Sequence, residues 1–205
     1  MKYPFIVRLT LADYVTLAGM VVALCALYTA LLGHVWLSIS LLYLAMLADA
    51  LDGKLARFLK SERPFGRYLD GFCDVLIYLI APALLFYCSG FRGGWSLFSA
   101  LMIICGCLRL ARFNESGNIT HNAVLAYRGM PVFWSVFILS AWKLGQLSLS
   151  PVLSAVLLSL ALVVFSVAMI TDRPFYKFSS LAVIIALCLG GITLFGLLHL
   201  GVING

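Results

Sequence analysis

Charged side chains are scarce in this sequence: Asp, Glu, Lys and Arg make up 11% of its 205 residues, against about 25% in ordinary soluble domains. Hydrophobic residues make up 63%. This balance excludes a soluble globular domain and predicts an integral membrane protein. One membrane-spanning helix needs about 20 apolar residues, so we expect residues 1–205 to form a single membrane domain with no room for a soluble one.

The sequence also lacks the usual patterns of metal-binding or redox cysteine and histidine. None of the six cysteines forms a Cys-x-x-Cys pair, and most lie in apolar runs, where a thiol behaves as a small hydrophobic group. None of the three histidines lies near the acidic segment described below. We therefore assign the cysteines no redox or metal role, and we expect no nucleic-acid partner.

Long apolar runs, separated by turn signals and charges, predict an all-α bundle of six to eight membrane-spanning helices. The pattern favours seven, at about 12–33, 35–58, 67–89, 94–113, 130–146, 149–171 and 178–203. Residues 1–11 contain aromatic and basic side chains, and we expect them to form an anchor segment along the membrane surface.

Basic residues are unevenly distributed between the two sides of the predicted bundle. With the amino terminus in the cytoplasm, twelve of the fourteen Lys and Arg residues fall on the cytoplasmic side, and only Arg92 and Lys143 fall outside. This asymmetry matches the positive-inside rule. All eight acidic residues also fall on the cytoplasmic side, so we predict an active site at the cytoplasmic face of a cell's inner or cytoplasmic membrane.

Four aspartates form two stripes on consecutive predicted helices. Asp49 and Asp52 share one helix face, and Asp70 and Asp74 share a face of the next, because residues three or four apart are neighbours on a helix. The short connection "LKSERPFGRY" favours antiparallel, adjacent helices. The four carboxylates are then expected to converge.

Convergent carboxylates repel one another and are poorly solvated near a membrane unless a cation neutralises them. Sites made only of carboxylates select hard cations. We therefore predict Mg²⁺ or Mn²⁺, with Ca²⁺ as an alternative occupant. Four acids are enough for two ions about 3.5–4 Å apart, the arrangement used in phosphoryl transfer. The alternative is a solvated helix end with paired charges.

Small residues accompany the acids on the same faces. Gly53, Ala56 and Gly66 exclude bulk where a ligand is expected, and Arg57 offers a fixed cation for an anionic group. Close packing between helices is the alternative explanation of the two glycines.

Written out, residues 49–74 read D-x2-D-G-x2-A-R-x8-G-x3-D-x3-D. This pattern resembles the signature of the CDP-alcohol phosphatidyltransferases. The resemblance implies a polytopic membrane enzyme of phospholipid biosynthesis that works among membrane lipids. Such an enzyme transfers a phosphatidyl group from CDP-diacylglycerol to a small polar alcohol and releases CMP. The resemblance also suggests a homodimer.

Carried over to this sequence, the resemblance assigns Asp49, Asp52, Asp70 and Asp74 to divalent metals that bind the diphosphate of the CDP-linked lipid. Asp74 is implied to be the catalytic base as well, taking the proton from the acceptor hydroxyl.

The same resemblance gives the small residues and the arginine a role in binding the CDP group. Gly53, Ala56 and Gly66 are implied to make space for the cytidine. Arg57 is implied to secure the nucleotide or its phosphates.

Three downstream segments resemble the phosphatidylserine synthase branch and imply L-serine as the acceptor: "LRLARFN" (108–114), "YRGMP" (127–131) and "MITDRPFYKF" (169–178). The candidates to hold the acceptor carboxylate or the lipid phosphate are Arg109, Arg112, Asn114 and Arg128, because guanidinium groups suit both anions. Contact with lipid headgroups at a helix end is the alternative for the arginines. The long loop 115–128, with His121, departs from the branch pattern, so choline, inositol or glycerol phosphate stay open as acceptors.

Two other classes of protein fit less well. A cation-coupled transporter needs polar residues along a path through several helices, whereas the runs 149–171 and 178–203 are nearly featureless and every acid lies on one side. A structural scaffold leaves the eight-position pattern unexplained.

Overall fold

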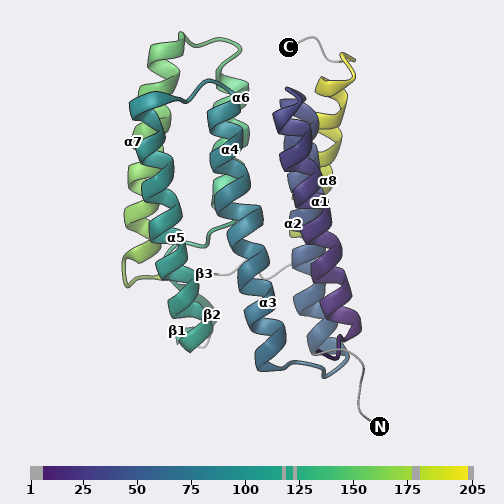
Figure 1. Ribbon diagram of the computed structural model, residues 1–205. Coiled ribbons are helices and arrows are strands. Elements are labelled where there is room, and N and C mark those ends of the chain that lie inside the picture. The colour runs from purple at the N-terminus through teal and green to yellow at the C-terminus, as the bar shows by residue number, and fades with distance from the viewer. Residues whose placement is uncertain (1–6, 117–118, 122–123, 177–180, 203–205) are drawn as a thin grey trace.

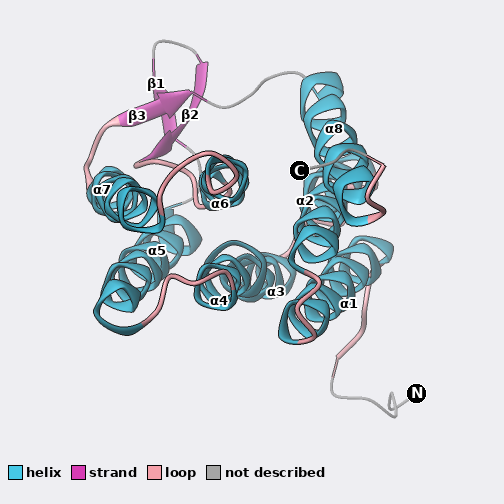
Figure 2. Ribbon diagram, turned by 90° about the horizontal axis from the view of Figure 1, so that it is seen from above, coloured by secondary structure: helices cyan, strands magenta, loops and turns pink. Residues whose placement is uncertain are grey.

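The computed structural model describes residues 7–116, 119–121, 124–176 and 181–202 (Figure 1). These residues form a bundle of roughly parallel and antiparallel helices, with a small three-stranded sheet at one corner (Figure 2). Most of the segment 1–11, expected to lie along the membrane surface, falls outside the described residues.

Long helices make up most of the bundle. They are α1 (Leu11–Leu31), α2 (Val35–Phe58), α5 (Ser96–Ser116), α7 (Pro151–Ile170) and α8 (Leu181–His199). A further continuous helical rod consists of α3 (Pro64–Asp74), the π-helical segment η1 (Val75–Ile80) and α4 (Ala81–Cys88). The turn η2 (Gly93–Trp95) leads into α5. Six of these segments are long and apolar enough to cross a membrane, which confirms the predicted all-α membrane bundle.

The predicted span 130–146 is shorter than expected. Here α6 (Trp134–Gly145) has only 12 residues and is about 18 Å long at 1.5 Å per residue, which is less than the membrane thickness. The helix starts late because the chain before it is tied to α7: the Met130 N–H donates to the Ala168 carbonyl at 2.9 Å. The described residues thus contain seven helical rods, of which six reach spanning length.

Small side chains allow α1 to lie close to α2. The buried face of α1 is a stripe of Gly19, Ala23, Ala26 and Ala30, and a Cβ atom added at Gly19 would lie 3.1 Å from the Ala48 Cβ. Such stripes let helices pack tightly in a membrane, where their backbones can approach closely. The helix α8 covers α2, α7 covers α5, and the α3–α4 rod stands between the two groups (Figure 2).

The predicted loop 115–128 contains two strands. The strands β1 (Ile119–His121) and β2 (Val124–Arg128) pair antiparallel, and β2 also pairs with β3 (Pro174–Tyr176), which follows α7. This pairing brings "YRGMP" beside "TDRPF", two segments more than forty residues apart in the sequence. The sheet closes the end of the bundle where α5 and α7 end (Figure 1).

Gly129 makes this junction possible. Its φ is +72°, and an added Cβ would lie 2.1 Å from the Met169 carbonyl oxygen. Only glycine fits such a close approach in a left-handed backbone conformation. The loop before α6 is therefore fixed against the end of α7.

Candidate metal and substrate site

Three of the four predicted metal ligands converge. Oxygen atoms of Asp49 on α2 and of Asp70 and Asp74 on α3 all lie within 4.8 Å of one another, and all three residues are half-buried. A spacing of four on α3 places Asp70 and Asp74 on one face, as the sequence predicts.

The fourth predicted ligand, Asp52, lies just beyond this group. It is buried, with 4% of its surface exposed, and its carboxylate accepts a short hydrogen bond from the Thr16 hydroxyl on α1. The same hydroxyl also lies 3.1 Å from the Ala12 carbonyl. Thr16 thus holds one oxygen of Asp52 and ties α2 to α1 beside the carboxylate group.

A tyrosine that sequence reasoning did not single out belongs to the site. The buried Tyr78 hydroxyl donates to Asp49 Oδ2 at 2.6 Å. Tyr78 lies in the π-helical segment that begins directly after Asp74. A π-helix turns the chain less per residue than an α-helix, so this wider turn keeps Tyr78 on the face of Asp70 and Asp74. The π-helical turn leaves no signal in the sequence. Tyr78 follows Asp74 at the same spacing of four that separates Asp70 from Asp74, and this spacing could have placed it on their face.

The helices α2 and α3 do not pack tightly against each other. The main neighbours of α3 are α1, α5 and its own continuation η1. Gly66 faces α1, since a Cβ added there would lie 3.4 Å from Asp13 Oδ1. The buried Asp13 in turn forms an ion pair with Arg63 and closes a capping box with Thr10. The contact of α3 with α1 therefore holds α3 near Asp49, although α3 does not pack tightly against α2.

The remaining predicted nucleotide residues lie on the last two turns of α2. Gly53 and Ala56 are half-buried, and Arg57 is exposed. A Cβ added at Gly53 would lie 3.7 Å from Arg57 Nη1, so the guanidinium folds back over the glycine. Gly53, Ala56 and Arg57 follow Asp49 by about one to two turns of α2. Gly66, in contrast, faces α1.

Three of the four predicted acceptor residues line one cleft. Arg109 and Arg112 from α5 and Arg128 from the end of β2 face a cavity of about 360 Å³, which the end of α7 completes through Thr171 and Asp172. Arg112 pairs with Glu115 at 2.6 Å, and Arg128 Nε lies 3.7 Å from Asp172 Oδ1. Guanidinium groups gathered in this way suit a carboxylate or phosphate ligand.

Arg109 is the buried arginine of this cleft. Only 7% of it is exposed, and it lines the cleft. The guanidinium also lies 5.1 Å from the centre of the Phe113 ring, which fixes its direction.

Asn114, the fourth predicted acceptor residue, packs against α3. A Cβ added at Gly71 would lie 2.6 Å from Asn114 Nδ2. Gly71 immediately follows Asp70 and is buried. Asn114 thus holds the end of α5 against α3 beside the carboxylates, and it is not among the residues that line the arginine cleft.

The donor set fits a hard divalent cation. The clustered ligands are carboxylates alone, with no cysteine or histidine among them, and such sites favour Mg²⁺, Mn²⁺ or Ca²⁺. Three half-buried carboxylates at this separation repel one another strongly unless a cation lies between them. Tyr78 and Thr16 hold ligand oxygens of Asp49 and Asp52 from outside, as partners of metal ligands commonly do.

Comparison with known proteins agrees with this geometry. Residues 9–163 match the family model described as CDP-alcohol phosphatidyltransferase. That region includes the four aspartates, α1, the three cleft arginines and most of α7.

Several curated proteins are similar to the chain. A CDP-diacylglycerol–serine O-phosphatidyltransferase of Methanocaldococcus jannaschii is 40% identical over 106 residues, which are 51% of this chain and 49% of the relative. The enzyme of the same name from Bacillus subtilis is 29% identical over 58% of this chain and 66% of its own length. An archaetidylserine synthase of Methanothermobacter thermautotrophicus is 42% identical over 36% of this chain and 34% of its own length. The chain thus spans about half the length of the first of these relatives.

Proposed function

Because the chain belongs to the CDP-alcohol phosphatidyltransferase family, we propose that it transfers a phosphatidyl group from CDP-diacylglycerol to the hydroxyl of L-serine. The products are phosphatidylserine and CMP. The names of the similar proteins from two different organisms support serine as the acceptor.

One observation carries this proposal: the single helix α5 contributes to both parts of the site. Its Arg109 and Arg112 line a cleft whose guanidinium groups suit the serine carboxylate, and its Asn114 packs against Gly71, the neighbour of Asp70. A serine bound in the cleft through its carboxylate would therefore present its hydroxyl toward an aspartate.

In this reaction Asp74 acts as the general base. It accepts the proton of the serine hydroxyl, whose oxygen forms a bond to the lipid-side phosphorus, while the bond from that phosphorus to the CMP oxygen breaks and CMP leaves.

Divalent ions, Mg²⁺ or Mn²⁺ and in our proposal two of them, would be held by Asp49, Asp52, Asp70 and Asp74. When bound, they neutralise charge on the diphosphate and on the leaving CMP. Ca²⁺ fits the same ligands as an occupant. Gly53, Ala56 and Gly66 would border the cytidine, and Arg57, exposed at the end of α2, would bind the nucleotide phosphates.

The cleft residues divide into different roles. Arg112 and Arg128 would hold the serine carboxylate or the lipid phosphate, since both line the cavity. Asn114 would act indirectly by holding α5 against α3 next to Asp70.

We further propose that the site faces the cytoplasm, because the helix ends beside it carry most of the basic residues of the sequence. The homodimer suggested by the family resemblance stays a prediction. Large apolar side chains are exposed along α1, α7 and α8, and lipid or a second copy would cover them.

The test is release of CMP from CDP-diacylglycerol by the purified protein, with Mg²⁺ or Mn²⁺ and a panel of acceptors. We expect release with serine and none after chelation of the metal. Release only with choline, inositol or glycerol phosphate would overturn the acceptor while leaving the reaction class. Absence of release with every acceptor would overturn the reaction itself.

A pair of arginine variants tests the assignment of the cleft. Arg112→Gln should raise the KM for serine, whereas Arg92→Gln, an exposed arginine at the other end of the bundle, should leave it unchanged. If both variants have the same KM for serine, the cleft does not bind the acceptor.

A further inference from the structure

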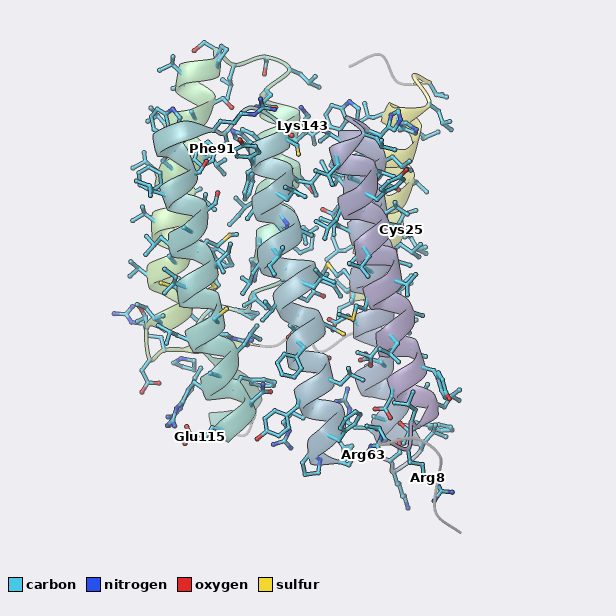
Figure 3. All side chains as sticks on the ribbon, in the orientation of Figure 1. Arg8, Cys25, Arg63, Phe91, Glu115 and Lys143 are labelled. Carbon is cyan, nitrogen blue, oxygen red and sulfur yellow. The ribbon has the colours of Figure 1, made fainter. Side chains whose placement is uncertain are left out.

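A second cavity lies at the end of the bundle opposite the aspartates. It has a volume of about 360 Å³ and lies where the turn after α4 meets the ends of α6 and α7. Figure 3 shows two of its lining residues, Lys143 and Phe91, at the end of the bundle away from Arg63 and Glu115. Its size lies within the range of about 300–1,000 Å³ typical of small-ligand sites.

A cation without an anionic partner lines this cavity. Lys143 is half-buried, and its ammonium group donates to Gln146 Oε1 at 3.0 Å and lies 5.4 Å from the centre of the Trp36 ring. Among the described residues, none of the ion pairs involves Lys143. All eight acidic side chains of the sequence belong to the other half of the bundle. Partial burial of a charge is costly unless an opposite charge compensates it.

Two hydroxyl groups at the same cavity lack partners. Ser154 is 1% exposed, and the Oγ atoms of Ser154 and Ser89 are both buried without a hydrogen-bond partner. Both residues line the cavity. A serine hydroxyl rotates freely and can donate to a ligand, and buried polar groups are normally satisfied. Two of the buried hydroxyls that lack a partner among the described residues thus belong to residues that line this cavity.

The surrounding residues make the cavity rigid. Gln146 Nε2 donates to the Ser89 carbonyl at 3.1 Å, and Trp142 Nε1 donates to the Ser154 carbonyl at 3.1 Å. These bonds hold the turn after α4 and the start of α7 around Lys143. The donors are thus placed before a ligand arrives, which reduces the entropy lost on binding.

We propose that this cavity binds the phosphate group of an anionic lipid headgroup, with Lys143 as the countercharge and Ser89 and Ser154 as hydrogen-bond donors. A phosphate offers the negative charge and the several acceptor oxygens that this set of donors requires. The lipid tails would follow the exposed apolar side chains of α7 next to the cavity, among them Val152, Leu153 and Val156. This site is separate from the proposed transferase site and takes no part in its chemistry.

The test compares thermal unfolding of the purified protein in detergent with added phosphatidylglycerol, with phosphatidylcholine, and with soluble glycerol 3-phosphate. A ligand that binds the folded state raises the unfolding temperature in proportion to its occupancy. We expect phosphatidylglycerol to raise the midpoint more than phosphatidylcholine does. If glycerol 3-phosphate raises the midpoint by a comparable amount, the cavity binds the phosphate group of soluble esters as well as that of lipids.

Four variants assign the effect to the cavity. Lys143→Gln should weaken the apparent affinity for phosphatidylglycerol about tenfold, as expected when a hydrogen bond to a charged group is lost, and Ser154→Ala should weaken it several-fold. Lys143→Arg should largely restore it. Arg92→Gln removes the same charge at the same end of the bundle but does not line the cavity, so its response should equal that of the unaltered protein.

The proposal is overturned if neither phosphatidylglycerol nor glycerol 3-phosphate raises the midpoint more than phosphatidylcholine does, or if Lys143→Gln and Arg92→Gln respond alike. If Lys143→Gln does not fold, Ser154→Ala is compared with Arg92→Gln instead, and equal responses of these two variants overturn the proposal. CMP release should be unchanged in Lys143→Gln, so failure of this proposal is distinguishable from failure of the proposed transferase activity.

Discussion

The two ends of the bundle carry opposite charge imbalances. Where α2 approaches α3, three half-buried aspartates lie within 4.8 Å of one another, and each needs positive charge nearby. At the other end, the half-buried Lys143 lies beside two unsatisfied hydroxyls with no carboxylate among its described contacts. We therefore expect cations to bind at the end with the aspartates and an anion to bind at the end with Lys143.

The difference shows how unpaired charges mark binding sites in a membrane protein. Most of this bundle is held together by apolar packing, in which a charge has no structural use. Charges that are neither exposed nor paired are expensive, so they persist where a ligand compensates them. Asp13 and Arg63 provide the contrast, since these two opposite charges pair with each other and join α1 to the start of α3.

The largest expected effect tests the acidic end. Asp74→Asn keeps the shape of the side chain but removes the base, so turnover should fall by about 10²–10⁴-fold while nucleotide binding is largely retained. Single-turnover CMP release and a nucleotide-binding assay measure the two properties. Glu62→Gln is the matched control, an exposed acid at the same end. Near-normal turnover of Asp74→Asn would exclude its role as base.

The second prediction compares two glycines with left-handed backbones, one at each end. Gly129→Ala should lower the free energy of unfolding by about 2–5 kcal/mol, because strain adds to a collision with the Met169 carbonyl. Gly201→Ala has a similar φ but open space around it, and should cost about 1–2 kcal/mol. Thermal unfolding in detergent measures both. Equal losses would show that the junction of β2 with α7 tolerates a Cβ.

The third prediction concerns the hydroxyl that holds Asp49. Tyr78→Phe should weaken Mn²⁺ binding about 10–100-fold, because Asp49 loses the bond that orients it. Electron paramagnetic resonance of free Mn²⁺ measures this without an activity assay. Tyr43→Phe is the control: Tyr43 is also buried, but its hydroxyl bonds to Ser140 instead. Unchanged Mn²⁺ affinity in Tyr78→Phe would remove this residue from the site.

The smallest expected effect concerns an exposed ion pair at the acidic end. Glu115 and Arg112 have side chains that are 72% and 55% exposed, and such pairs contribute about 0.2–1 kcal/mol to stability. Glu115→Gln should therefore shift the unfolding temperature only slightly. A large shift would mean that charges at this end matter for stability in general, and would weaken the contrast with the buried aspartates.

The sequence was most informative about the long helices. The predicted run 35–58 coincides with α2, and 149–171 differs from α7 by one or two residues at each end, because long apolar runs bounded by charge and proline give a strong signal. The strands β1 to β3 could not be predicted, since segments of three to five residues are too short for a clear alternation. The length of α6 was overestimated because its apolar run starts before the helix does.

Within the site, spacing was enough to place the aspartates on common faces but not to place their partners. The pairing of Asp70 with Asp74 follows from a period of four. The contacts of Tyr78 with Asp49 and of Thr16 with Asp52 join residues 29 and 36 positions apart, and depend on how three helices pack. Arg109 was predicted as an acceptor residue, but its place in one cleft with Arg128 and Asp172 required the fold.

The most direct test of the account is the anomalous scattering from a crystal soaked in Mn²⁺ together with a CDP-linked lipid. The account predicts density for bound manganese between the carboxylates of Asp49, Asp70 and Asp74. Carboxylates that point away from one another, with no manganese between them in the presence of the lipid, would contradict it.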